Sequence, residues 1–251
     1  KYFLRKQNRS TGIPEEDILQ IAIKSMGLDD LKEFNPREKV IEYLLEDENK
    51  TAKLIDLTVK GFADETSRES PAPGGGTISA YMGALGAALG TMVANLSSHK
   101  AGWDDRWEEF SNWADKGQKI QAELMVLVDE DTEAFNRIME AFGLPKKTDE
   151  EKEARTAAIQ AATLFATQVP LHTMQASFEL CRAMAEEGNP NSVSDAGVGV
   201  LAARAAVLGA GLNVKINASG LKDRETADKL VSEANELIKK ANELEAEIMK
   251  I

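Results

Sequence analysis

The sequence has few residues that form covalent cross-links or bind transition metals. It contains one cysteine, Cys181, and two histidines, His99 and His172. A single thiol excludes an intrachain disulfide, and its place in an apolar helical stretch predicts a buried thiol in a reducing compartment. The two histidines lack metal-ligand spacing to each other or to Cys181, so we expect no bound metal.

Basic residues are too few to balance the acids. The 251-residue chain has 30 Lys and Arg against 42 Asp and Glu, and its net charge of -12 repels nucleic acid and anionic membranes. We therefore expect neither as a partner. No signal-peptide pattern opens the chain, and residues 1–5 read like the middle of a longer sequence. We expect a cytoplasmic protein with further residues upstream.

Charged residues are absent from 77–98, a run about as long as a membrane-spanning helix. This run carries Gly83, Gly86 and Gly90 among many alanines, and it lacks the dense Leu, Ile and Phe of a span. Small residues instead let neighbouring helices approach closely. We expect a core helix and no membrane span.

Alternating strand patterns and fixed-period repeats are also lacking, so we predict an all-α, up-and-down bundle of long antiparallel helices. Short helical patterns at 15–26 and 36–45, separated by Gly27 and an Asn-Pro turn, set residues 1–45 apart as a module. The main helical domain is predicted over 46–251.

Helical spacing and end signals divide that domain. An amphipathic helix is predicted around 54–62, followed by the uncharged helix and a third helix over about 104–142. Thr148 and Glu151 form a capping box for the next stretch, which Pro170 must kink or divide before Gly188 ends it. Ser192 or Ser194 is the predicted cap of a helix that continues to about residue 213.

The last helix has apolar residues at strict heptad steps, which suits left-handed bundle packing or a dimer seam. These residues are Leu230, Ala234, Leu237, Ala241, Leu244, Ile248 and Ile251.

An acid interrupts the apolar stripe of the third predicted helix. Steps of three or four from Leu124 and Leu127 place Asp131 on that stripe ahead of Phe135, so its side chain should face the core. Asp129 points well away and is predicted to be a solvated charge. A buried acid serves either function or structure, and the pattern alone leaves both open.

Polar groups gather in two further places. Gly74, Gly75 and Gly76 lead into a helix N-terminus, which attracts anions or carbonyls, but no lysine or preceding strand completes a phosphate loop. A tight helix–helix turn is the alternative. Ser194 and Asp195 begin a later helix, and Asn213, Lys215 and Asn217 lie at its far end, so the two ends frame a candidate cleft. Asp195 alone is also explained by the helix dipole.

Four separated motifs, in this order, resemble the family of cyclodeaminases and cyclohydrolases that includes the cyclodeaminase domain of formimidoyltransferase-cyclodeaminase. They are PAPGGGT at 71–77, LVDEDTEAF at 127–135, SVSD at 192–195 and NVKIN at 213–217. The likeness spans roughly residues 50–251, and LPKKT at 144–148 and VPL at 169–171 add to it. The front motifs at 27–29, 34–36 and 41–44 are similar to the end of the transferase half and its linker.

The resemblance implies an enzyme that converts 5-formimidoyltetrahydrofolate to 5,10-methenyltetrahydrofolate and ammonia in histidine degradation, with no cofactor beyond this substrate. It also implies a catalytic aspartate, for which the motif leaves Asp129 and Asp131 open and the periodicity selects Asp131. Motif positions that it implies near the folate are Gly74, Gly75, Gly76, Asp129, Ser194, Asp195, Asn213 and Asn217.

A cation should hold the folate's glutamate or polyglutamate tail, and the candidates are Lys215, Lys146, Lys147 and Arg204. The resemblance further implies a homo-oligomer, at least a dimer, and an upstream transferase domain. A methenyltetrahydrofolate cyclohydrolase is the alternative within this family. A non-catalytic helical oligomerisation module is the alternative from another class.

Overall fold

A computed structural model describes residues 1–48, 53–70, 72–174 and 178–251. Within this part of the chain there are α-helices and short 3-10 turns but no strand. The elements are α1 Tyr2–Lys6, α2 Glu15–Ser25, α3 Pro36–Lys39, α4 Ile41–Glu48, η1 Leu54–Asp56, α5 Val59–Thr66, α6 Gly75–Ser98, η2 Asp104–Arg106, α7 Trp107–Gly143, α8 Asp149–Met174, α9 Phe178–Glu187, η3 Pro190–Ser192, α10 Val193–Ser219 and α11 Arg224–Ile248.

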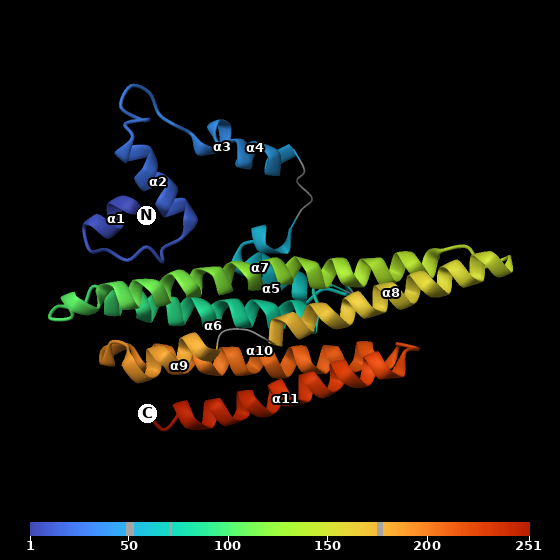
Figure 1. The fold of residues 1–251 in the computed structure, drawn as a ribbon. Helices are drawn as coiled ribbons and strands as arrows, with labels where there is room; N and C mark the ends of the chain where they lie inside the picture. Colours follow the sequence, from blue (N-terminus) through green and yellow to red (C-terminus); the bar gives the residue numbers. More distant parts are fainter. Residues whose placement is uncertain (49–52, 71, 175–177) are drawn as a thin grey trace.

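The long helices α6, α7, α8, α10 and α11 lie side by side as an up-and-down bundle, which confirms the predicted fold class (Figure 1). Helix α6 packs against α7 and α10, and α11 covers α10 from the other side. The four α-helices before residue 49 lie apart from the bundle, above α7 in the same view (Figure 1).

The uncharged helix is the central element of the bundle, as its small residues predict. A Cβ on Gly86 would come within 2.8 Å of the Gly199 carbonyl oxygen of α10. Both α6 and the segment Pro190–Ser219 are long and apolar enough to cross a membrane. In α6, however, 61% of the apolar window is buried inside the bundle, as in a core helix of a soluble protein.

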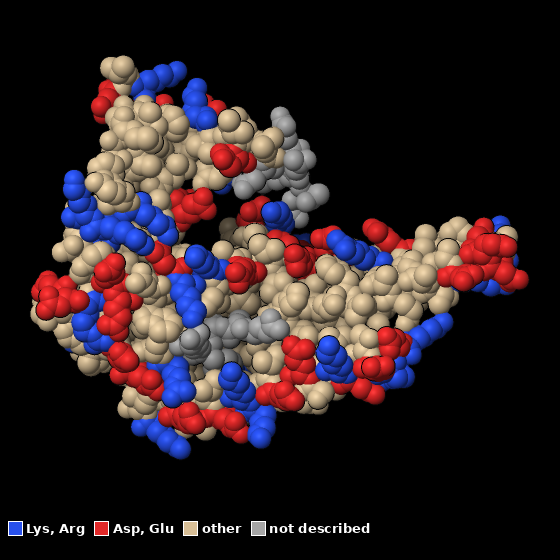
Figure 2. Space-filling model, in the orientation of Figure 1, with Lys and Arg blue, Asp and Glu red and all other residues tan. Residues whose placement is uncertain are grey.

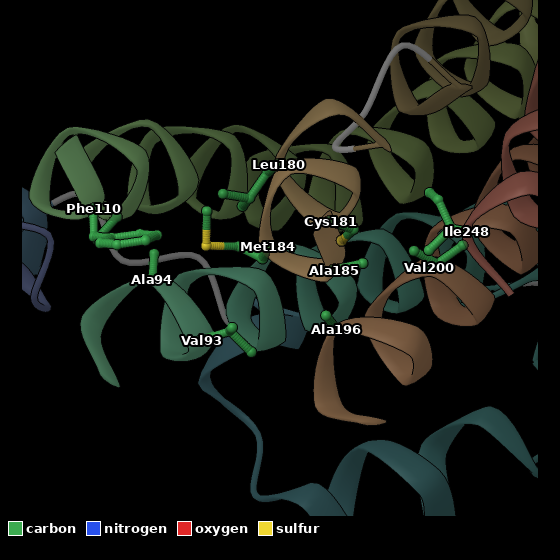
Figure 3. Close-up of a cluster of buried hydrophobic side chains, with 11 residues drawn as sticks. Val93, Ala94, Phe110, Leu180, Cys181, Met184, Ala185, Ala196, Val200 and Ile248 are labelled. Atoms are coloured by element: carbon green, nitrogen blue, oxygen red, sulfur yellow. The ribbon is translucent and has the colours of Figure 1, made fainter. Parts of the chain in front are cut away.

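Buried side chains from five helices meet near the short helix α9, as Figure 3 shows. Phe110 of α7, Leu180 and Met184 of α9 and Val200 of α10 belong to this cluster. The predicted burial of Cys181 is confirmed, and burial raises the pKa of its thiol to about 12. The thiol is therefore protonated and unreactive at neutral pH.

Several predicted boundaries hold, and others do not: the helical pattern at 36–45, for example, forms two helices, α3 and α4. The capping box holds, because the Thr148 hydroxyl accepts from the Glu151 amide at 3.2 Å and Glu151 accepts from the Thr148 amide at 3.1 Å. Instead of one amphipathic helix around 54–62 there are η1 and α5, since the Thr58 hydroxyl caps α5 by accepting from the Gly61 amide. Residues 49–52 lie outside the described residues.

Helix α8 continues past Pro170 to Met174, so the predicted division does not occur at the proline. Helix α10 begins at Val193 with Ser192 in the cap position, one of the two caps predicted, although the Ser192 side chain makes no capping hydrogen bond; it ends at Ser219, six residues beyond the predicted end near 213.

The heptad face of α11 is used inside the chain. Ala234 and Ala241 are buried in a cluster with Val207, Ala210 and Val214 of α10, and Leu230 and Leu237 pack against it. Of the two roles that its spacing allowed, the structure therefore shows bundle packing.

The N-terminal module is anchored to the bundle through the buried residues Ser10 and Thr11. The Thr11 amide donates to the Ser111 hydroxyl at 3.0 Å, and the Thr11 hydroxyl donates to Asp115 at 2.5 Å. Asn95 of α6 donates to the Gly12 carbonyl at 2.8 Å. These bonds fix the module at the junction of α6 and α7.

The Gly86→Ala substitution tests the close approach of α6 and α10. The added methyl group meets backbone atoms of α10, so we expect a loss of about 1–3 kcal/mol in the free energy of unfolding. Gly197→Ala is the matched control, because its added Cβ meets nothing within 4 Å and should gain about 0.5–1 kcal/mol from helix propensity. Urea denaturation measures both, and equal stabilities would contradict the packing described.

Candidate active site

A pocket of about 220 Å³ opens where α6 begins. Helices α6, α7, α8 and α10 all contribute to its wall. The lining residues are Ala72, Gly74, Gly75, Gly76, Asp131, Ala134, Phe135, Ile138, Ala166, Asn213 and Asn217. Six of the ten residues predicted for the site, Gly74, Gly75, Gly76, Asp131, Asn213 and Asn217, are brought together here from distant parts of the sequence.

Asp131 projects from α7 toward the first turn of α6, so the inward orientation predicted from its stripe is confirmed. The Thr77 hydroxyl donates to Asp131 Oδ2 at 2.8 Å, and the Thr77 backbone amide donates to the same carboxyl group. The Thr77 hydroxyl in turn accepts from the Gly74 amide at 3.3 Å. The carboxylate is thus held by a chain of hydrogen bonds at the start of α6.

Two opposing effects set the protonation of Asp131. Burial raises the pKa of its carboxyl group, and the hydrogen bonds from Thr77 lower it. The net result is a raised pKa, because removing a carboxylate from water costs more than these two donors return. A raised pKa makes this carboxyl group a stronger base than a solvated aspartate, as a group that accepts a proton during a reaction needs to be.

Gly76 is required by the closeness of Asp131 to the α6 backbone. A Cβ on Gly76 would collide with Asp131 Oδ1, at 2.1 Å. Gly75, by contrast, is exposed, and its Cβ would lie 3.3 Å from Asn213 Nδ2 across the pocket. The glycine run therefore lets a carboxylate approach the helix end, where backbone amides favour negative charge.

Pro170 and Asn217 form a linked feature of the pocket wall. Proline has no N–H, so Pro170 leaves the carbonyl of Ala166, four residues earlier in α8, without its helical donor. Asn217 Nδ2 donates to that carbonyl at 2.6 Å. The bond satisfies a helical carbonyl and fixes the Asn217 side chain beside the pocket.

Asp129 was predicted to be a solvated charge, and this is wrong because its side chain is half-buried and bonded to the backbone. It was also predicted to lie near the folate, but it does not line the pocket. Its Oδ1 accepts the Leu54 amide at 2.7 Å, so it anchors η1 on the outer side of α7. Partial burial under this segment raises the pKa of the Asp129 carboxyl group. Asp129 is absent from the pocket lining because two residues along a helix turn a side chain by about 200°.

Ser194 and Asp195 also lie away from the pocket. They occupy the first turn of α10, whereas Asn213 and Asn217 are near its other end. At 1.5 Å per residue, Asp195 and Asn213 are about 27 Å apart along the helix. Within one chain, the two ends therefore do not frame a common cleft.

The cations predicted for a glutamate tail are scattered. Lys215 is exposed and lies on the opposite face of α10 from Asn213 and Asn217, which share a face four residues apart. Arg204 pairs with Glu245 of α11 at 2.8 Å. Lys146 and Lys147 are exposed at the turn between α7 and α8. None of the four lines the pocket.

The sequence analysis did not assign five of the lining residues to the site, namely Ala72, Ala134, Phe135, Ile138 and Ala166. It also did not assign Thr77, which holds Asp131 by a hydrogen bond. Thr77 was part of the glycine motif, and Phe135 and Ile138 follow Asp131 on its stripe, so their signals were present in the sequence. Ala166 is recognisable only through the proline four residues after it. Pro71 of the glycine motif lies outside the described residues.

A larger hollow of about 490 Å³ lies elsewhere, between α7 and the end of α8. Its wall is formed mainly by Ile120, Leu124 and Leu127, with Glu123 and His172 among the polar groups. The smaller pocket is the stronger candidate, since it combines a buried carboxyl group, helix-end amides and two side-chain amides.

Comparisons with known proteins identify two matching family models. The one described as Formiminotransferase-cyclodeaminase matches residues 58–236, and the one described as Formiminotransferase domain matches residues 1–46.

Similar proteins agree with these matches. A methenyltetrahydrofolate cyclohydrolase of Methylorubrum extorquens is 41% identical over 76% of this chain and 93% of its own length. A mouse formimidoyltransferase-cyclodeaminase is 34% identical over 91% of the chain, which spans only 43% of that relative. The crystal structure of a formiminotetrahydrofolate cyclodeaminase from Thermotoga maritima has a TM-score of 0.67 at 26% identity, covering 79% of this chain and 98% of that one.

The pH dependence of stability tests the burial of Asp131. Because the folded-state pKa of this carboxyl group is raised, ionisation opposes folding, and stability is lost as the pH rises through the folded pKa. Asp131→Asn removes the ionisation. Its stability relative to the unsubstituted protein should therefore increase from about pH 4 to pH 7, as measured by urea denaturation at each pH. A difference that falls with pH would show that the carboxylate is stabilised by its surroundings.

Proposed function

Because the chain belongs to the formiminotransferase-cyclodeaminase family, we propose that it is a formimidoyltetrahydrofolate cyclodeaminase. Members of this cyclodeaminase and cyclohydrolase family act in folate one-carbon metabolism. The proposed reaction converts 5-formimidoyltetrahydrofolate to 5,10-methenyltetrahydrofolate and ammonia, as a step of histidine degradation, and needs no cofactor besides this substrate.

The reaction requires one proton to move between two nitrogens. Folate N10 attacks the formimidoyl carbon attached to N5, forming the new C–N10 bond, and N10 must lose its proton. The amidine enters as its protonated cation, so its outer nitrogen already carries two hydrogens and must gain one more before its bond to carbon breaks and ammonia leaves. One carboxyl group beside the carbon can accept the first proton and deliver the second, so no external oxidant or reductant is required.

Asp131 is suited to this transfer by its surroundings, and this is the observation on which the proposal rests. Burial raises the pKa of its carboxyl group toward the working range of an acid–base catalyst. Thr77 fixes the carboxyl group from the α6 side. As an anion, Asp131 also stabilises the positive charge that spreads over N5, the carbon and N10 in the product.

The rest of the pocket suits the ring end of a folate. Phe135 and Ile138 give an apolar wall that suits a flat ring. Asn213 and Asn217 each donate from Nδ2 to a helix carbonyl, so their side-chain oxygens are the groups we expect to accept hydrogen bonds from the ring's N–H groups. A volume of about 220 Å³ is below the range of pockets that enclose a whole drug-sized ligand. The glutamate tail would therefore extend outside it.

Methenyltetrahydrofolate cyclohydrolase is the second candidate, favoured by the 41% identity to the Methylorubrum enzyme. In that reaction water adds to the methenyl carbon, one of its two C–N bonds breaks to leave a formyl group, and a net proton is released; the same carboxyl group would take the proton from the water and deliver one to the departing ring nitrogen. The cyclodeaminase is preferred because residues 1–46 match the Formiminotransferase domain. The partial coverage of the bifunctional relatives leaves transferase activity outside this proposal.

Assays of two reactions test the proposal. The purified chain should release ammonia from 5-formimidoyltetrahydrofolate, and Asp131→Ala should lower kcat by about 10²–10⁴-fold, the usual contribution of a positioned acid–base group. The variant should still bind a reduced folate, seen as a rise in Tm. Asp129→Asn is the matched control, because its carboxylate anchors η1 outside the pocket, and its kcat should be unchanged.

Three outcomes would contradict the proposal in different ways. Hydrolysis of methenyltetrahydrofolate without ammonia release would select the cyclohydrolase. Near-normal ammonia release by Asp131→Ala would move the chemistry to another residue. No change in Tm with reduced folate, together with no turnover, would favour the non-catalytic helical module.

A further inference from the structure

The proline inside α8 lies beside the pocket, in a helix that continues past it. Pro170 is buried, and α8 runs on to Met174. A proline in a helix interior costs stability, because one hydrogen bond is missing and the ring crowds the carbonyl four residues earlier. A buried carbonyl that loses its helical donor needs another one. The partner that this carbonyl takes therefore shows what the proline does.

The carbonyl that Pro170 leaves without a helical donor is that of Ala166, a buried residue that lines the pocket. It accepts a hydrogen bond from Asn217 Nδ2 of α10, at 2.6 Å. The bond joins two walls of the pocket, because it crosses from α10 to α8. The orientation of the Asn217 side chain therefore depends on a residue in another helix.

This bond decides which end of the Asn217 amide is left for a ligand. A side-chain amide has one donor end and one acceptor end, and a carbonyl oxygen can only accept. The end at the Ala166 carbonyl must therefore be Nδ2. Oδ1 has no hydrogen-bond partner among the described residues, and it is not one of their buried unpaired atoms. It is thus an accessible acceptor in the pocket that Asn217 lines.

Asn213 is held in a different way. Its Nδ2 donates to the Gly209 carbonyl at 3.1 Å, one turn earlier in the same helix. Gly209 lies in the interior of α10, where carbonyls have helical donors. The orientation of Asn213 is therefore set within α10, and only that of Asn217 depends on the proline.

Charge does little to select the ring that enters the pocket. Among the described residues, no Lys or Arg lines it. On the face of the molecule that Figure 2 shows, acidic and basic side chains are interspersed, without a large patch of one sign. Discrimination between rings of similar shape therefore falls to neutral hydrogen-bonding groups such as the Asn217 amide.

We propose that Pro170 is a positioning residue for ligand recognition, because it holds the Asn217 amide with its oxygen toward the ligand. The pocket then presents an acceptor at this point. It favours a ring whose facing edge carries an N–H group, and it disfavours an edge with a lone pair, which would leave two acceptors unpaired. For the identity of the ligand the inference rests on the proposed function, since the pteridine of a tetrahydrofolate offers several N–H groups.

An ordinary residue at position 170 would remove this constraint. Its N–H would bond to the Ala166 carbonyl along α8, so Asn217 Nδ2 would no longer be the only donor there. The amide could then turn over and present Nδ2 to the ligand. Asp131 and its contact with Thr77 belong to α7 and α6 and stay as they are. We therefore expect weaker binding, with little change in the proton transfer.

The packing of α8 against α10 has other supports. Gln160 of α8 donates to the Gly220 carbonyl at 3.1 Å and accepts from the Lys222 amide at 2.6 Å. Leu171 of α8 and Val214 of α10 share a buried cluster. Loss of the bond between Asn217 and Ala166 should therefore leave the two helices in place, and a change in binding would report on the amide.

The Pro170→Ala substitution restores the N–H without adding bulk. The dissociation constant of 5-formyltetrahydrofolate, measured by isothermal titration calorimetry, should rise about 3–10-fold, the usual effect of one neutral hydrogen bond. In the assay of ammonia release, KM should rise by a similar factor while kcat changes little. Gln168→Ala is the matched control, because Gln168 is exposed on α8 and does not line the pocket, and it should change neither quantity.

A second variant separates the missing N–H from the proline ring. Lactic acid incorporated at position 170 has the methyl side chain of alanine but an ester oxygen in place of the N–H. It should therefore bind 5-formyltetrahydrofolate as tightly as the unsubstituted chain does. Binding as weak as that of Pro170→Ala would overturn the proposal, because the ring and not the missing donor would then be responsible.

A double-mutant cycle links the effect to the amide. In the Asn217→Ala background the group to be positioned is gone, so Pro170→Ala should not weaken binding further. Equal effects in both backgrounds would overturn the proposal. Tight binding and ammonia release that do not respond to Pro170→Ala would overturn this inference alone. An unsubstituted chain that neither binds 5-formyltetrahydrofolate nor releases ammonia would overturn the proposed function together with it.

Discussion

The contact between Asp131 and the first turn of α6 is the constraint around which the candidate site is built. A buried carboxyl group must be compensated, and here both the hydroxyl and the amide of Thr77 donate to it. This contact requires that nothing larger than glycine stands at position 76, since a Cβ there would overlap the carboxylate. It also requires α6 and α7 to pack closely at this end, which the small residues of α6 permit. These hydrogen bonds offset only part of the cost of burying the carboxylate, so the pKa of Asp131 stays raised. The chemistry proposed for Asp131 follows from this raised pKa.

A second compensation shapes the opposite wall. Pro170 removes one helical hydrogen bond from α8, and the freed Ala166 carbonyl takes the Asn217 amide instead. Two motifs separated by more than forty residues, VPL at 169–171 and NVKIN at 213–217, thereby become one structural unit. On each wall of the pocket a polar side chain thus bonds to a backbone group that has no regular helical partner. Asp131 accepts from an amide in the first turn of α6, and Asn217 donates to a carbonyl of α8.

The fold class and the inward orientation of Asp131 were predictable because helical periodicity is a local property, repeated over many residues. The capping box and the long third helix were predictable for the same reason. The partner of Asp129 was not, because η1 packs on α7 through contacts that no spacing within α7 encodes. Likewise, sequence placed Ser194 and Asp195 with Asn213 and Asn217 as polar ends of one helix, but the length of α10 separates them. The heptad spacing of α11 suited bundle packing and a dimer seam equally, and only tertiary packing shows that this face is covered within the chain.

The proposed reaction requires the reacting carbon of the folate to lie against Asp131. The most direct measurement is a crystal structure of this chain with a 5-formyl-substituted tetrahydrofolate bound. We expect the N5 substituent within hydrogen-bonding distance of the Asp131 carboxyl group, with the pteridine between Phe135 and the side chains of Asn213 and Asn217. A folate bound instead in the hollow beside His172, with Asp131 facing only Thr77, would contradict the account.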